Sequence, residues 1–146
     1  MKPTRLAAAL TAATLTACGS QPVTTPEPAA TTPPPLLIRG DILVPLPHFR
    51  WDKGQGCWGA EQHADLRQDA RVTITDNTGT TVAMGKLELG SVTMNPADRE
   101  RAQLCTFTFR IEGVPAGGQF YTVTAGNVTE QFPAAELAQP VRLHAR

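Results

Sequence analysis

The chain has 146 residues, of which 41% are hydrophobic and 18% are charged, and its 13 basic residues balance its 13 acidic residues. This length allows one domain with short flanking segments. A formal charge of zero argues against nucleic acid as a partner, because phosphate binding needs clustered Lys and Arg side chains. No run of 18 apolar residues is present, so we expect no transmembrane helix.

Residues 1–17 have the features of a secretory signal. Lys2 and Arg5 form a basic start, an apolar stretch of Ala, Leu and Thr follows, and small residues precede the expected cleavage site. The run Leu15-Thr16-Ala17-Cys18 resembles the lipobox of bacterial lipoprotein precursors. This resemblance implies that Cys18 is lipidated on its sulfur and becomes the first residue of the mature protein. The alternative is an ordinary secreted protein that is cut near Ala17.

The lipobox resemblance implies an extracytoplasmic protein that is held to a bacterial membrane by lipid. Two or three acyl chains make release slow, at about 0.8 kcal/mol per buried methylene. Loss of Lys2 and Arg5 with the signal leaves 11 basic and 13 acidic residues, a net charge of −2. Such a charge argues against electrostatic docking to anionic lipids, so attachment would depend on the lipid anchor alone.

Residues 18–35 are predicted to form a disordered Pro/Thr-rich tether behind the lipidated cysteine. Six of the 13 prolines lie here, and Val23 is the one large apolar side chain. This composition cannot bury enough surface to offset the entropy of ordering. At roughly 3.1 Å per residue in an extended polyproline conformation, the tether could hold a domain about 40–50 Å from the membrane.

Residues 36–146 are long enough to form one hydrophobic core and consist mainly of short alternating segments. The first alternating set is Ile38, Gly40, Ile42 and Val44. Further strands are expected over residues 71–75, from 80 onward, and over 104–112, 120–125, 128–132 and 141–144. The clearest is Leu104–Glu112, where the apolar residues Cys105, Phe107, Phe109 and Ile111 alternate with polar residues. We therefore predict an all-β fold, an antiparallel β-sandwich of seven or eight short strands or a small barrel.

Three local features interrupt these strands. The change of parity between Val82 and Leu87 predicts a β-bulge at Gly85, which would turn Met84 and Leu89 toward one buried face. Short helical turns are predicted over residues 97–102, behind an Asn-Pro cap, and over 133–138. The segment 45–70 contains no clear strand and is predicted to be a loop, and loops of this length are usually functional.

Cys57 and Cys105 form an even pair once Cys18 carries lipid, and outside the cytoplasm such a pair is expected to be oxidised. The disulfide would close a loop of 49 residues and stabilise the domain by roughly 4 kcal/mol in the chain-entropy model. Two free buried thiols and a metal-binding pair are the alternatives. The separation of 48 positions, with no nearby cysteine, argues against zinc.

A second resemblance covers about 70 residues of the mature part. The motifs that carry it are Gly54-Gln55-Gly56-Cys57-Trp58-Gly59, Asp65-Leu66, residues 70–76, Gly85-Lys86-Leu87, residues 105–109, Val114-Pro115 and Phe120-Tyr121. Together they resemble a small extracytoplasmic domain of bacterial lipoproteins and membrane-anchored proteins. Such domains have no assigned biochemistry, so the resemblance implies a fold and a location without an activity.

Enzyme chemistry has little support in the sequence. The serines lie outside any nucleophile motif, and we predict a non-enzymatic protein without a cofactor or a metal. His48, His63 and Asp65 could form a metal site, but we interpret them as solvated loop residues. His144 is expected to be exposed on the last strand, opposite the apolar positions. The nearby Asp65 and Asp69 are interpreted as solubilising residues.

Binding is the favoured functional class. Trp51 and Trp58, the only tryptophans, lie in the predicted loop and could bind a glycan or an envelope protein. Alternatively, one or both indoles fold inward and close the end of the sandwich. We therefore expect a lipid-anchored envelope lipoprotein that binds or presents a partner. The alternatives are an assembly module that docks proteins by strand addition and an envelope enzyme.

Overall fold

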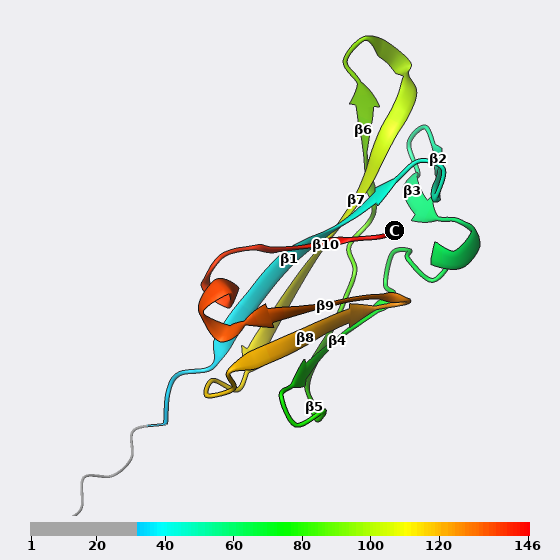
Figure 1. The fold of residues 1–146 in the computed structure, drawn as a ribbon. Coiled ribbons are helices and arrows are strands. Elements are labelled where there is room, and N and C mark those ends of the chain that lie inside the picture. The colour runs from blue at the N-terminus through cyan, green and yellow to red at the C-terminus, as the bar shows by residue number, and fades with distance from the viewer. Residues whose placement is uncertain (1–31) are drawn as a thin grey trace, which may run out of the picture. The chain divides into compact units, whose positions relative to one another are not determined.

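The computed structural model describes residues 32–146, which form one compact unit. The predicted signal (1–17), the lipidation site Cys18 and most of the predicted tether lie outside the described residues. The first strand, β1 (Leu36–Pro45), begins four residues into the unit. Figure 1 shows the described part as two layers of strands with a small hairpin at one end.

The first sheet contains four strands in the order β10–β1–β7–β6. Its central strands are β1 and the long β7 (Asp98–Val114), which pair in antiparallel register. The edge strands are β6 (Ser91–Asn95) and β10 (Val141–His144). The β1–β10 pair is parallel, which departs from the predicted purely antiparallel arrangement. Alternation of side chains has the same period in both pairings, so it does not reveal strand direction.

The second sheet has the order β5–β4–β8–β9 and is antiparallel throughout. Its strands are β4 (Arg71–Asp76), β5 (Thr81–Lys86), β8 (Phe120–Ala125) and β9 (Val128–Pro133). The chain after β5 crosses to the first sheet, where Leu87 forms an isolated bridge with Phe109 of β7. The two sheets are thus joined by main-chain pairing at this side of the sandwich.

One hydrophobic core lies between the two sheets, and its residues come from alternate positions of the strands. Cys105, Phe107, Phe109 and Ile111 of β7 are all buried. The core also includes Ile38, Ile42, Val44, Val72, Ile74, Tyr121, Val123 and Leu143. The prediction of an all-β sandwich from period-two burial is therefore confirmed. The described residues contain ten strands rather than seven or eight.

The prediction that residues 45–70 form a loop is wrong. A hairpin of β2 (Phe49–Asp52) and β3 (Gly56–Gly59) lies here, followed by the single-turn 3-10 helix η1 (Glu61–His63). Each strand has four residues, which is too short for alternation to be recognised. Gly54 and Gly56, which suggested irregular backbone, adopt positive φ angles at the turn of this hairpin.

The predicted helical turn over residues 97–102 is also wrong, because residues 98–102 belong to β7. Asn95 pairs with Asp98 across a tight turn, and the Asn95 side-chain oxygen accepts a hydrogen bond from the Ala97 amide at 2.9 Å. The Asn-Pro pair therefore caps a turn between strands instead of a helix. The second predicted turn is confirmed as the 3-10 helix η2 (Ala134–Ala138).

The predicted bulge at Gly85 is displaced. The register between β4 and β5 shifts at Val82, whereas Gly85 pairs regularly with Val72. Met84 lies opposite Thr73 on the outer face and is 63% exposed, so the expectation that it is buried is wrong. Gly85 has a different role: a Cβ there would lie 2.6 Å from Ile111 Cγ1, so glycine allows the strands to approach.

Candidate functional site

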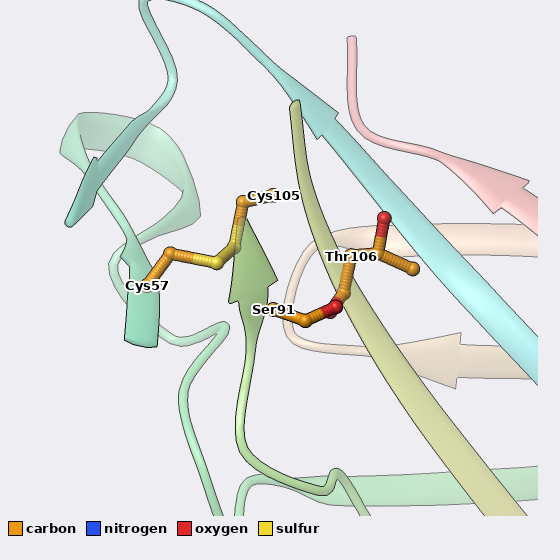
Figure 2. Close-up of a disulfide and its surroundings, with 4 residues drawn as sticks. All are labelled: Cys57, Ser91, Cys105 and Thr106. Atoms are coloured by element: carbon orange, nitrogen blue, oxygen red, sulfur yellow. A yellow bond between two sulfur atoms is a disulfide. The ribbon is translucent and has the colours of Figure 1, made fainter. Parts of the chain in front are cut away.

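Cys57 and Cys105 form the predicted disulfide. Their Cα atoms are 6.0 Å apart, within the range that a disulfide requires, and both residues are buried. Figure 2 shows that the bond joins β3 to β7. This pairing rules out the alternatives of free thiols and a shared metal for these two residues.

The disulfide is one of several contacts that attach the β2–β3 hairpin to the first sheet. Beside it, the Cys57 amide donates a hydrogen bond to the Gly90 carbonyl at 3.1 Å. A Cβ on Gly90 would lie 2.5 Å from the Cys57 carbonyl oxygen and 2.9 Å from Sγ, so only glycine permits this approach. On the neighbouring pair of strands, the Ser91 hydroxyl donates to the Thr106 carbonyl at 3.3 Å (Figure 2).

Trp51 and Trp58 both lie on this hairpin and both are partly exposed, at 37% and 40%. The register pairs Trp51 with Cys57 and Trp58 with Arg50. Directly opposed residues of a hairpin share a face, so the two indoles point to opposite faces. Cys57 faces the body of the domain, which places Trp51 on the inner face and Trp58 on the outer face. Neither tryptophan is therefore buried in the end of the sandwich, and the two indoles do not form one continuous surface.

The outer face of the hairpin also carries a side chain that the sequence reasoning missed. The antiparallel bridge between Cys57 and Gly90 places Leu89 opposite Trp58, on the same face of the hairpin. Leu89 was expected to be buried, but it is 52% exposed. We call Arg50, Trp58 and Leu89 the outer hairpin face. No local pattern identifies Leu89, because it becomes a neighbour of Trp58 only through the bridge between Cys57 and Gly90, which lie far apart in the chain.

The guanidinium group of Arg50 is held close to the main chain. Its Nη1 donates to the Pro47 carbonyl at 3.1 Å and to the Phe49 carbonyl at 3.2 Å. Phe49 itself is buried. The outer hairpin face therefore combines an exposed indole, an exposed aliphatic side chain and a positioned cation on a strand anchored in the core.

A polar cleft of about 350 Å³ lies near the hairpin, between β9 and the end of β10. It is lined by His63, Asn127, Val128, Thr129, Glu130, His144 and Arg146. On the β10 side, the His144 amide donates to Glu130 Oε1 at 2.9 Å, and the His144 side chain is half exposed, as expected. Side-chain contacts therefore join the sheets here.

His63 is buried, with 2% of its surface exposed, so its interpretation as a solvated loop residue is wrong. Its ring lies 5.3 Å from the ring of His48 in an edge-to-face arrangement. The structure brings these two histidines together, whereas Asp65 and Asp69 are exposed and Asp69 pairs with Lys86 at 3.3 Å. Within residues 32–146, no group of three His, Cys, Asp or Glu side chains is arranged to hold a metal ion.

Two further observations concern the described residues and known proteins. Among residues 32–146, no helix is long and apolar enough to cross a bilayer. Comparison of the chain with protein-family models, curated proteins and solved structures finds no match.

Proposed function

We propose that this protein is a lipid-anchored lipoprotein of the bacterial envelope that binds or presents a partner without enzymatic chemistry. The lipid anchor rests on the lipobox resemblance that ends at Cys18. The binding role rests on one observation, the exposure of Trp51 and Trp58 on a hairpin that a disulfide fastens to the domain.

The position of the hairpin supports a role in presentation. The chain enters the domain at Leu36, and β1 leads from there to the end where the β2–β3 hairpin lies (Figure 1). Ten strand residues span about 33 Å. A domain tethered through its N-terminal segment would thus carry the hairpin on the side away from its attachment point.

The physical chemistry of the hairpin suits recognition. Tryptophan and arginine supply much of the binding free energy in many interfaces, especially where neighbouring groups exclude water. The disulfide and the buried Phe49 hold the hairpin in place before a partner arrives, which lowers the entropy lost on binding. An indole beside a cation and a leucine can contact either a protein surface or the apolar face of a sugar.

The lipid anchor is tested by growth with labelled palmitate. We expect label in the wild-type protein and none in the Cys18→Ala variant. An unlabelled wild-type protein, or label that persists in the variant, contradicts the anchor. Labelling does not depend on the tryptophans, so this result is separate from the test of binding.

Partner binding is tested by crosslinking and capture from intact envelopes. We expect Trp58→Ala to reduce a captured species at least tenfold, because the central contact of the outer face is lost. Phe120→Ala is the matched control: Phe120 is 42% exposed and begins β8 in the second sheet. Equal capture by both variants and the wild type contradicts the hairpin as the binding surface.

One observation favours strand addition as the second candidate function. Within the described sheets β6 is an edge strand, and none of its five residues is charged, although charged residues commonly protect such edges. In that case Thr93→Lys, an exposed change on β6, would abolish capture and Trp58→Ala would leave it unchanged. The two candidates thus predict opposite results for the same pair of variants.

A further inference from the structure

A regular array of threonines lies on the outer face of the second sheet, where β5, β4, β8 and β9 run side by side (Figure 1). The register places these threonines opposite one another in two rows across the strands. Thr73, Thr124 and Thr129 share one row. The other row contains Thr81, Thr75 and Thr122. We call these residues the threonine array.

Alternation along the strands directs the array outward. Ile74 lies between the threonines of β4 and Val123 between those of β8, and both are buried in the core. Successive side chains of a strand point to opposite faces of a sheet, so the threonines point away from the core. Met84 of β5 completes the first row and Gln131 of β9 completes the second. Each row therefore runs across all four strands.

The array is uncharged, whereas the outer face of the first sheet is not. On the first sheet, Arg39 of β1 lies opposite Arg110 of β7, and Arg110 pairs with Glu112 at 2.7 Å. On the second sheet, the opposed Arg71 and Lys86 lie at one end, beyond the first row. Exposed surfaces ordinarily mix both signs of charge. A neutral face that is four strands wide is therefore suited to an uncharged ligand.

The hydroxyl groups of the array can bind polar groups of a ligand. The hydroxyls of Thr124 and Thr129 lie 3.1 Å apart, so one donates to the other. A hydroxyl has one donor and two acceptor positions, so the accepting residue keeps its own proton for a ligand. Thr108 on the outer face of the first sheet differs, because its hydroxyl donates to Glu88 at 2.6 Å. The array thus presents donors and acceptors beside methyl groups.

The spacing of the array matches a repeating ligand. Neighbouring strands lie about 4.8 Å apart, which is close to the repeat of β-linked pyranose units in an extended polysaccharide. A chain that crosses the strands would therefore meet one threonine of a row with each sugar. Sugar hydroxyls would exchange hydrogen bonds with the threonine hydroxyls, and the C–H groups of the rings would contact the threonine methyl groups.

We propose that the threonine array binds a flat, uncharged chain of β-linked pyranoses that lies across β4, β8 and β9. The size of the array favours such a chain over a protein. The two rows measure about 14 Å across the strands and about 7 Å along them, whereas a stable protein interface buries about 800 Å² per partner. The hairpin is attached to the other sheet, so this site goes beyond the binding role proposed above and does not depend on it.

Binding is tested by retention of the full-length protein, solubilised in detergent, on insoluble cellulose and chitin. Both probes are uncharged chains of β-linked pyranoses. We expect at least one probe to retain the wild-type protein, and Thr124→Lys to weaken this retention about tenfold, because a charge that must lose water replaces a central hydroxyl. Thr108→Lys is the matched control, since it adds the same charge to the outer face of the first sheet and should leave retention unchanged.

Three results would overturn the proposal. The first is a wild-type protein that neither probe retains, and the second is equal retention of Thr124→Lys and Thr108→Lys. The third is retention that is lost in Trp58→Ala but kept in Thr124→Lys, which would assign the polysaccharide to the outer hairpin face.

A second variant and a second measurement complete the test. If Thr124→Lys does not fold, Thr129→Lys takes its place, because Thr129 is exposed on the edge strand β9 and its loss should also weaken retention. Analytical ultracentrifugation compares the wild-type protein with the variant. A wild-type dimer that the lysine substitution disrupts would show that the face joins two copies of the chain, and would contradict a polysaccharide site.

Discussion

Strand β7 and the segment 45–70 are both held in the same core, yet by different means. In β7, alternate side chains from Cys105 to Ile111 enter the core. The strand pairs with β6 over residues 98–106 and with β1 over residues 104–114. The other segment has two four-residue strands, one helical turn, a disulfide and a buried histidine. Many equivalent side-chain contacts thus hold the long strand, whereas a few specific contacts position the hairpin.

The largest effect is expected when one of the alternating core side chains of β7 is removed. Phe107 is fully buried in the middle of β7, and Phe107→Ala should lower the free energy of unfolding by about 3–5 kcal/mol, because it leaves a cavity. Denaturant unfolding measures the change. Arg110→Ala on the exposed face is the control and should cost less than about 0.5 kcal/mol. Equal losses would contradict the assignment of the buried face.

The next largest effect is expected on removal of the disulfide, which joins segment 45–70 to β7. Replacement of both Cys57 and Cys105 by alanine should lower the free energy of unfolding by about 2–4 kcal/mol, since the unfolded chain gains freedom. Hydrogen exchange should accelerate more in β2 and β3 than in the middle of β7. Uniform acceleration throughout the domain would show that the hairpin does not depend on this single contact.

Substitution of Gly59 tests whether its close contact with the His63 main chain excludes a side chain. A Cβ at this position would overlap the carbonyl oxygen of His63, so Gly59→Ala should lower the free energy of unfolding by about 3 kcal/mol. Gly54→Ala is the control: its Cβ would meet no atom within 4 Å, and its φ of +88° should cost only about 1 kcal/mol. Thermal or denaturant unfolding compares the two variants, and equal costs would argue against steric exclusion at Gly59.

The smallest effect concerns the β4–β5 turn, which local hydrogen bonds stabilise. The Thr78 hydroxyl, helped by the Thr78 and Thr80 amides, lowers the pKa of Asp76, and slight desolvation opposes this shift. The carboxylate therefore stabilises the fold above its ordinary pKa, and this contribution disappears as pH falls through the lowered folded pKa.

Asp76→Asn should consequently lower the midpoint of thermal unfolding slightly at pH 7, and the difference from wild type should shrink below about pH 4. Melting curves at pH 3 and 7 measure it. Glu112→Gln, an exposed change in β7, provides the comparison variant. A difference between wild type and Asp76→Asn that persists unchanged at pH 3 would contradict a role for the ionised carboxylate.

Much of the sandwich could be predicted from local patterns. The buried face of β7, the exposed His144 and the short η2 turn were all correctly inferred, because each depends on neighbouring residues. The disulfide partners could be inferred because the predicted lipidation of Cys18 leaves two of the three cysteines to pair. The Asn-Pro pair at residues 95–96 was misread because the same polar cap suits a helix start and a strand turn.

The candidate sites were harder to predict for a physical reason. The sequence leaves two outcomes open for Trp51 and Trp58, exposure for binding or inward folding that closes the sandwich, and the structure shows both partly exposed. Their opposite orientations follow from the register of two strands that the sequence does not reveal. Leu89 lies beside Trp58 because Gly90 forms a bridge with Cys57, and His63 is buried because Asn127 and Arg146 come to it from distant parts of the chain.

The sequence by itself determined the β class, the buried positions of the long strands and the pairing of Cys57 with Cys105. These depend on side-chain period and on composition, which are properties of the chain alone. Only the tertiary structure decided that β10 runs parallel to β1, that the indoles face opposite ways and that His48 meets His63. Such features depend on which distant segments become neighbours, and a period of two is the same for every choice of neighbour.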